Sequence, residues 1–355
     1  MELKQPGLFQ RILKKEPQEN AFIRLNNLFA TTPLQEIKLE EVVAISTLYK
    51  VDFRKKFLDK LQLLYRTYLQ YCFIDKILTD EELNDIGKLK DLLSLKSDEV
   101  EIIHNSLAGE LYKEEFNKVI SDGKIDKQEE EFLEKLKNNL RLPENIIQKI
   151  SEESRKQFVE IQLGKIIEDG KISPDEWEEF TAIARNLSVD LNIGEVSKQQ
   201  LNKLKLFWLI ENGELPIANV PINLQKNEFC YYYTEAEWLE TRTITQRINY
   251  GGPTARIRII KGVYYRAGSM SVQRITSEQQ QVIDSGTLYV TNKRIIFVGN
   301  KKNTNIPLGK ILSVEPFSDG VGIEKDSGKS PALRVSDNAD IFAMTLARVI
   351  NDLQS

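Results

Sequence analysis

The sequence predicts an α+β protein of several domains, in which an all-helical repeat module precedes a small antiparallel β-barrel or sandwich that a C-terminal helix caps. Three observations predict this architecture. A turn motif recurs at an interval of 47 residues, the hydrophobic pattern changes from helical to alternating after residue 225, and a proline-containing stretch separates the two patterns. The expected boundaries are an N-terminal helical segment over 1–60, the repeat over 61–214, a linker over 215–225 and the β-domain over 226–355.

The composition excludes several classes of protein. With 41% hydrophobic and 29% charged residues it is typical of a globular protein, and no run of about 18 apolar residues predicts a membrane-spanning helix. The start lacks the apolar stretch of a signal peptide. Two cysteines and a single histidine, His104, argue against a disulfide framework and a multi-histidine metal site. Since no catalytic motif is recognised either, we expect a cytoplasmic protein, at most peripheral to a membrane, without enzymatic activity or cofactor.

The first 60 residues precede the regular repeats. Leu8, Phe9 and Ile12 lie among basic side chains, as in a short basic amphipathic helix. Such a helix contacts a membrane surface or packs as an ordinary terminal segment, and both interpretations stay open. Residues 21–60 have helical hydrophobic spacing and are a candidate leading copy of the repeat, with a slipped register.

Turns rich in Asp and Gly define the repeat. Asp122-Gly123 and Asp169-Gly170 lie 47 residues apart, and Asp75 lies 47 residues before Asp122. A capping residue follows each turn, with a glutamate three residues later; these pairs are Thr79 and Glu82, Asp126 and Glu129, and Ser173 and Glu176. The apolar positions of the following helix repeat as well, at Ile86, Leu133 and Phe180, at Leu89, Leu136 and Ile183, and at Leu93, Leu140 and Leu187. Each copy is therefore expected to be a helical hairpin.

The same turns share Asp, Gly and Glu with EF-hand calcium loops. With Gly123 at position 6 of such a loop, Glu129 takes position 12, where a ligand is needed. Positions 1 and 3 then fall on Lys118 and Ile120, which offer no side-chain oxygen. The sequence therefore favours caps and solvated acidic faces over a calcium loop. The alternative is a weak divalent-cation site between repeats, with the ligands Asp122, Glu129, Asp169 and Glu176.

Residues 60–212 resemble the tellurite-resistance TerB-like helical family. The resemblance rests on the form Asp-Gly-Lys-Ile-x-x-x-Glu at 122–129 and 169–176, each followed by an amphipathic helix. It implies an intracellular helical module of a bacterial stress response, attached to other domains, with acidic surfaces that bind metal in some members. Lys76 stands where the first copy would carry glycine, so the resemblance implies no metal role there.

After the prolines of 216–221 the pattern becomes the alternation of β-strands. Segments rich in β-branched and aromatic residues predict seven or eight short strands, at 228–233, 238–246, 254–261, 286–291, 294–299, 310–316, 320–325 and 332–336. The last stretch, 339–353, has the spacing of an amphipathic helix. A small barrel or sandwich closed by that helix accommodates these elements.

Part of this region resembles the GRAM and bacterial pleckstrin-homology group. Its members share the string Gly-x-Leu-x-x-Thr-Asn-x-Arg-Ile/Leu-Ile-Phe, which stands here at 286–297. The similarity extends over 286–315 and, in strand count and terminal helix, over 226–353. It implies a bent sheet closed at one end by a helix, whose open end or loops bind phospholipid headgroups or partner proteins.

Positive charge is concentrated in the β-domain. Residues 226–314 hold 13 Lys and Arg against 6 Asp and Glu, although the chain as a whole has a net charge of −4. The candidate anion-binding residues are Arg242, Arg247, Arg256, Arg258, Lys261, Arg266, Lys293, Arg294, Lys301 and Lys302. Each basic side chain near an anionic membrane leaflet contributes about 1 kcal/mol of binding. The same charge also suits an acidic protein partner, the acidic repeats of this chain or of a second copy, or solvent alone, and these interpretations stay open. Nucleic acid is not expected as a partner.

The sequence therefore predicts a non-enzymatic adaptor or scaffold. Its basic β-domain would bind an anionic membrane surface or a protein partner, while the acidic helical repeats bind a second partner. Two alternatives remain, namely a divalent-metal-responsive sensor of the TerB type and a structural subunit that assembles into homo-oligomers.

Overall fold

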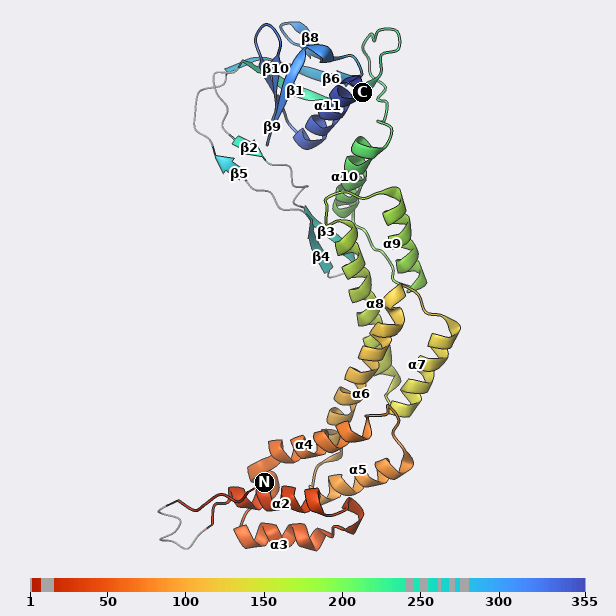
Figure 1. Ribbon diagram of the computed structural model, residues 1–355, viewed down its shortest axis with the longest axis vertical. Helices are drawn as coiled ribbons and strands as arrows, with labels where there is room; N and C mark the ends of the chain where they lie inside the picture. The colour runs from red at the N-terminus through yellow and green to blue at the C-terminus, as the bar shows by residue number, and fades with distance from the viewer. Residues whose placement is uncertain are drawn as a thin grey trace. The chain divides into compact units, whose positions relative to one another are not determined.

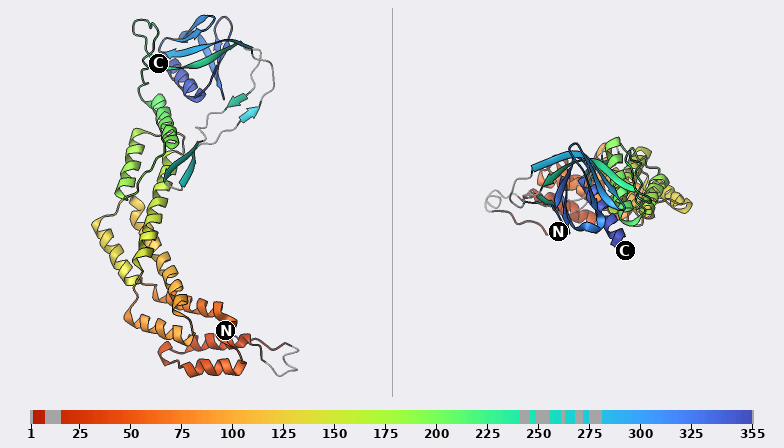
Figure 2. Two further views of the ribbon diagram at one scale, coloured as in Figure 1. Left: turned by 180° about the vertical axis from the view of Figure 1, so that it is seen from behind. Right: turned by 90° about the horizontal axis from the view of Figure 1, so that it is seen from above.

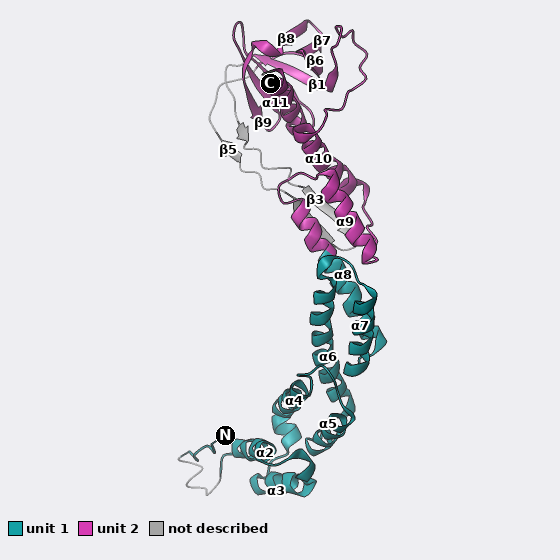
Figure 3. Ribbon diagram, turned by 45° about the vertical axis from the view of Figure 1, so that its right-hand side comes forward, with its two compact units in different colours: residues 1–158 teal, residues 159–355 magenta. Residues whose placement is uncertain are grey.

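The computed structural model describes residues 2–7, 16–240, 246–248, 255–260, 263–267, 272–274 and 281–354, with the backbone alone described within 246–274 (Figure 1). The chain divides into two compact units, residues 1–158 and 159–355 (Figure 3). Among the described helices, none combines the length and the apolar character needed to cross a membrane.

Unit 1 is built from helices joined by short turns. Its elements are α2 (Glu19–Thr31), the 3-10 turn η1 (Leu34–Glu36), α3 (Leu39–Tyr49), α4 (Phe53–Cys72), α5 (Asp80–Leu92), α6 (Ser97–Val119), the 3-10 turn η2 (Ile120–Asp122), α7 (Lys127–Leu140) and the first part of α8 (Glu144–Ile166). Helix α4 packs on α5 and α6 packs on α7, and each pair is one copy of the 47-residue repeat. The remainder of α8 belongs to unit 2, where it precedes α9 (Pro174–Asn186) and α10 (Glu195–Asn212).

The turn within each hairpin has the same backbone conformation in all three copies. Lys76, Gly123 and Gly170 have positive φ angles of 63°, 83° and 79°. A capping box then starts the second helix: in the second copy the Asp126 N–H donates to Glu129 Oε2 and the Glu129 N–H donates to Asp126 Oδ1, both at 2.8 Å. The other copies have the same box at their own capping residues. The capping boxes inferred from the sequence are therefore present.

Helices α2 and α3 form a leading copy of the repeat that is one helical turn short. A left-handed residue follows each of the helices α3, α5, α7 and α9 within two positions, and these residues are Lys50, Ser94, Arg141 and Ser188. The interval from the N-cap to this residue is 12 positions in α3, from Lys38, but 15 positions in α5, from Thr79. The missing three positions are close to one turn of 3.6 residues. This shortening explains the slipped register of the first 60 residues.

Unit 2 contains a curled, seven-stranded antiparallel sheet in the order β8-β7-β6-β1-β11-β10-β9. The elements of this domain are β1 (Cys230–Glu240), β6 (Gln281–Thr291), β7 (Arg294–Gly299), β8 (Asn303–Pro307), η3 (Leu308–Lys310), β9 (Ile311–Phe317), β10 (Gly320–Lys325), β11 (Pro331–Val335) and α11 (Ala339–Gln354). Two small ladders lie between β1 and β6 in the chain, one of β2 (Gln246–Ile248) with β5 (Val272–Arg274) and one of β3 (Ala255–Ile260) with β4 (Val263–Ala267). The sheet curls around α11 (Figure 2). An all-helical region followed by a helix-capped antiparallel half-barrel confirms the predicted fold class.

The inner face of the sheet and one face of α11 form the core of this domain. Phe342 and Leu346 of α11 are fully buried against Leu288, Phe297 and Leu333 of the strands. A side chain at position 286 would collide with the carbonyl oxygen of Val298 on β7, so only glycine permits this close approach of two strands.

Residues 218–224 pack on the outer face of the sheet. The Ala218 N–H donates to the carbonyl of Cys230 at 2.7 Å. Val220, Ile222 and Leu224 then cover a small apolar cluster on this face, which consists of Cys230, Tyr289 and Ile296. The proline-containing stretch therefore covers part of the outer face of the sheet.

Candidate functional site

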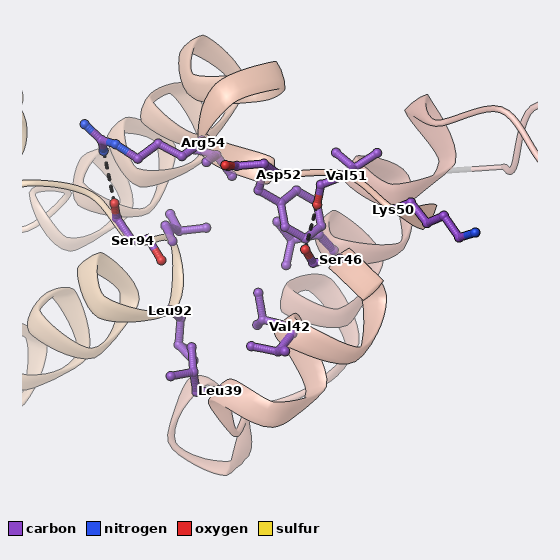
Figure 4. A pocket seen from close by; sticks show the side chains of 14 residues that line it. Leu39, Val42, Ser46, Lys50, Val51, Asp52, Arg54, Leu92 and Ser94 are labelled. Carbon is purple, nitrogen blue, oxygen red and sulfur yellow. Dashed lines mark hydrogen bonds between the residues drawn. The ribbon is translucent and has the colours of Figure 1, made fainter. Parts of the chain in front are cut away.

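Unit 1 contains a cavity of about 570 Å³ that is lined by α3, the start of α4 and the end of α5 (Figure 4). Leu39 and Val42 approach it from α3, and Leu92 approaches from α5 (Figure 4). The complete lining is Leu25, Leu39, Val42, Val43, Ser46, Lys50, Val51, Asp52, Phe53, Arg54, Leu61, Leu92, Leu93 and Ser94. We call it the α3–α5 cavity.

The apolar lining follows from the unusual sequence of α3, Leu-Glu-Glu-Val-Val-Ala-Ile-Ser-Thr-Leu-Tyr. A surface helix usually has one apolar face, which packs on the core. The apolar residues of α3 lie around its whole circumference, so part of its apolar surface is left over after that packing. Val42 and Tyr49 are buried, whereas Leu39 and Val43 remain 52% exposed at the mouth of the cavity. Helix α3 therefore presents an apolar face for which the described part of the chain provides no cover.

The polar groups of the cavity wall are engaged within the protein. The Ser46 hydroxyl donates to the carbonyl of Val51 at 2.6 Å, and Asp52 accepts the N–H of Lys55 as an N-cap. Lys50 is the exception, because it is exposed and makes no ion pair with any described residue.

Arg54 is held most firmly. Its guanidinium donates two hydrogen bonds, of 2.7 and 2.8 Å, to the Glu99 carboxylate and one of 3.0 Å to the carbonyl of Ser94. This paired hydrogen bonding from Arg54 lowers the pKa of Glu99 to about 2. Counting only contacts among the described residues, the cavity thus offers apolar surface and one unpaired cation, Lys50, at its rim, while most of its other polar side chains are engaged in internal hydrogen bonds.

The acidic candidate residues of the repeat accept hydrogen bonds from backbone N–H groups of their own turns. Asp122 Oδ1 accepts the N–H of Lys124 at 3.1 Å, and Glu129 closes a capping box. Asp169 and Glu176 make the equivalent bonds in the third copy. Across the described ranges no group of three or more His, Cys, Asp or Glu side chains is placed to hold a metal ion. The weak cation site stays a prediction, with Asp122 and Glu129 in unit 1 and the other two residues in unit 2.

Six of the ten basic candidates lie where side chains are not described. Arg242 and Lys261 fall outside the described residues, while Arg247, Arg256, Arg258 and Arg266 lie in β2, β3 and β4. The register of the β3–β4 ladder pairs Arg256 with Arg266 and Arg258 with Tyr264.

The four remaining basic candidates do not converge on a common anion site. Arg294 forms a two-point ion pair with the buried carboxylate of Glu228, at 2.9 and 3.1 Å. The ammonium groups of Lys293 and Lys301 donate to the backbone carbonyls of Lys226 and Ile283. The Lys302 N–H donates to the carboxylate of Asp284, which also accepts the N–H of Lys301. Arg294 is thus a structural residue, and the lysines are distributed around the turns.

His104 is also a structural residue. Its Nε2 lies 2.9 Å from the carbonyl oxygen of Leu140, and its ring packs edge-on against Phe73 at 5.6 Å. Burial lowers the pKa of His104. It ties α6 to the end of α7 and takes no part in the cavity.

The helical region has a counterpart among known families. Residues 26–202 match the model of the Tic110 family, which is described as a chloroplast envelope transporter. The match begins in α2 and ends in α10, so it covers the helical hairpins, including the shortened leading copy, and stops before the sheet domain. No curated protein sequence matches the chain.

The Tic110 match overturns several expectations. The resemblance to the TerB-like family is wrong, and no finding supports a GRAM or pleckstrin-homology domain. The motifs behind both were requirements of local structure: Asp-Gly with a capping box serves any tight helical hairpin, and Gly286 serves the close approach of two strands. The bacterial stress-response setting and the cytoplasmic location are likewise contradicted, because the matching family is one of the chloroplast envelope.

Proposed function

We propose that this protein is a non-enzymatic adaptor whose helical module binds an apolar segment of a protein partner in the α3–α5 cavity. The observation that carries the proposal is the cavity itself, apolar at its floor and open at Leu39 and Val43. A volume of about 570 Å³ lies within the usual range for binding sites, about 300–1,000 Å³.

The chemistry of the wall favours binding over catalysis. Ser46, Asp52 and Arg54 are all engaged in internal hydrogen bonds, so they fix the shape of the cavity and leave no activated group in it. Leu39 and Val43 lie one helical turn apart on α3 and are both exposed, so they form a short apolar strip along the mouth of the cavity. Such a strip suits a helix or extended segment that inserts two or three apolar side chains.

The Tic110 match supports a setting for this activity. That family is described as a chloroplast envelope transporter, and the matched residues include all of α3, α4 and α5. We infer that the adaptor serves a transport assembly at an envelope membrane, with the sheet domain as the site of a second partner. Arg294 is ion-paired with Glu228 and is therefore not available to bind a lipid phosphate. For this reason we favour a protein over an anionic lipid as the second partner.

A peptide selection tests the proposal. Peptides from a random displayed library are selected on the wild-type protein, and their affinities are measured by fluorescence polarisation. We expect apolar peptides whose affinity falls at least about tenfold in Val43→Asp, which corresponds to about 1.4 kcal/mol of binding free energy.

Ile102→Asp is the matched control. Ile102 lies on α6, outside the cavity lining, and is 69% exposed, so the same charge enters a comparable surface position. Peptides that bind both variants equally well, or a selection that enriches no apolar sequence, would refute the proposed function.

A further inference from the structure

The turn of the first repeat carries an apolar surface where the later turns are polar. Tyr71, Ile74 and Ile77 are 70%, 72% and 44% exposed around the end of α4. The equivalent positions, 47 and 94 residues later, are occupied by Lys118, Ser121 and Lys124 and by Lys165, Glu168 and Lys171. Since the backbone of the turn is the same in all copies, the hairpin does not require these apolar residues. We call these three residues the Tyr71 patch.

The Tyr71 patch and the α3–α5 cavity lie at opposite ends of the α4–α5 pair. The patch surrounds the C-terminus of α4, whereas Asp52, Phe53 and Arg54 of the cavity wall lie at its N-terminus. Helix α4 has 20 residues, which at 1.5 Å per residue corresponds to a length of about 30 Å. The patch is therefore too far away to fill the cavity of its own molecule.

We propose that the α3–α5 cavity receives the Tyr71 patch of a second copy of this chain. This inference rests on the proposed function and names the apolar segment that enters the cavity. Two apolar surfaces on one unit, one projecting from a turn and one recessed, are suited to each other. Their charges are complementary as well, because the exposed Asp75 lies within the patch, and Lys50, which forms no ion pair with a described residue, lies at the cavity rim.

The contact joins different surfaces of the two copies, so each bound copy still offers one free patch and one free cavity. Such head-to-tail contacts build chains or rings, in contrast to symmetric pairs that close at two. Three inserted side chains make a contact smaller than the standard interface of about 1,600 Å². We therefore expect weak self-association, with a dissociation constant on the order of 100 µM.

Sedimentation velocity of the full chain tests this inference. The wild-type protein is measured between about 5 and 500 µM, a range that brackets the dissociation constant expected for a contact of this size. Its sedimentation coefficient is expected to rise with concentration. Two variants are compared with it: Val43→Asp in the cavity, and a triple variant, Tyr71→Lys, Ile74→Ser and Ile77→Lys, which gives the first turn the residues of the second. We expect each variant alone to remain monomeric, and their equimolar mixture to form dimers and nothing larger.

The mixture distinguishes a patch-to-cavity contact from other modes of self-association. Two symmetric patches in contact would leave Val43→Asp fully associated, and a mixture that stays monomeric would exclude complementary surfaces. Ile102→Asp is expected to associate like the wild type, which controls for added negative charge. If the wild type stays monomeric at every concentration while apolar peptides still bind the cavity, this inference fails and the proposed function stands. If Val43→Asp changes neither the self-association nor the affinity for apolar peptides, both this inference and the proposed function fail.

Discussion

The ammonium of Lys76 lies 2.9 Å from the Glu115 carboxylate and so links the turn of the first repeat to α6. Glu115 is almost fully buried and also accepts a 2.7 Å ion pair from Lys118 of its own helix. Hydrogen bonds from Lys118 and Lys76 lower the pKa of Glu115. Lys76 performs this role from a left-handed backbone conformation, with φ of 63°, at the position where the later copies have glycine. The first copy therefore combines an unfavourable backbone with a favourable contact between repeats.

Replacement of Lys76 separates these two effects. A non-glycine residue in the left-handed region costs about 1–2 kcal/mol, whereas a partly exposed ion pair contributes about 0–1 kcal/mol. We expect Lys76→Gly to leave the free energy of unfolding unchanged or to raise it slightly. Lys76→Ala, which keeps the strain and loses the pair, should unfold more easily than Lys76→Gly by about 1 kcal/mol or more. Urea unfolding of both variants measures the difference, and equal stabilities would show that the turn is unstrained.

The fold could be predicted from the sequence because its determinants are local and repeated. The intervals of 47 residues, the capping boxes and the period-two strands each depend on neighbours a few positions away. The leading copy was harder to recognise, because α3 is shortened by one turn and the interval between left-handed residues falls from 47 to 44, as from Lys50 to Ser94. The signal of this copy lies at the ends of its helices and not at an Asp-Gly turn.

The candidate site could not be predicted in the same way. The α3–α5 cavity joins residues of several helices, from Leu25 to Ser94, so it depends on packing that no local motif encodes. One signal is present in the sequence, because α3 is apolar on more than one face, as at Val42, which lines the cavity, and at Leu48, which does not. Conversely, Arg294 was expected to bind an anion because its partner Glu228, 66 positions earlier, was not recognisable as a neighbour.

The capping boxes lead to a prediction for the helical module. Asp126→Ala removes the side-chain acceptor for the Glu129 N–H and is expected to lower the free energy of unfolding by about 1 kcal/mol. Glu129→Gln should cost less, because the amide oxygen still accepts the Asp126 N–H. Thermal unfolding followed by circular dichroism measures both changes.

Calcium provides a further test of the same residues. Since the described residues contain no cluster of three or more ligand side chains, we expect about 1 mM calcium, enough for even weak protein sites, to leave the melting temperature of the wild type unchanged. An increase that Glu129→Gln and Glu176→Gln together abolish would instead support the cation site predicted from the sequence.

Arg348 of α11 gives a prediction for unit 2. Its guanidinium donates to three carbonyl oxygens at the end of α10, those of Ile210, Glu211 and Gly213, at 2.7 to 3.3 Å. These are terminal helix carbonyls without partners in the helix. Arg348→Ala should lower the free energy of unfolding by about 1.5–3 kcal/mol and speed amide hydrogen exchange at the end of α10.

Arg348→Lys is the informative comparison for this contact. A lysine keeps the charge but lacks the fork of donors, so we expect it to restore little of the lost protection. Exchange rates in α10 that match the wild type in both variants would mean that α10 does not depend on this contact for its order.

The buried pair of Glu228 and Arg294 predicts how the sheet domain responds to acid. Burial acts to raise the pKa of Glu228, but hydrogen bonds from Arg294, from the Gln225 N–H and from Thr291 outweigh it, and the net pKa is lowered. A carboxyl whose pKa is lower in the folded than in the unfolded state stabilises the fold above the unfolded value, about 4.3 for glutamate. This stabilisation is lost as the pH falls through the folded pKa. The sheet domain should therefore lose stability below about pH 4.3.

Glu228→Gln isolates this contribution from other carboxyls such as Asp284, whose pKa is also lowered. Near pH 7 the variant leaves Arg294 without a charged partner and should be less stable than the wild type by about 3 kcal/mol. As the pH falls through the folded pKa of Glu228, the wild type loses its advantage and the two unfolding curves should converge. Fluorescence of Trp238 in a Trp177→Phe, Trp208→Phe background reports unfolding of the sheet domain, since Trp238 packs on Phe297 at 5.4 Å. A stability difference that stays constant from pH 7 down to about pH 3, below the unfolded value, would show that the ion pair does not set the acid response.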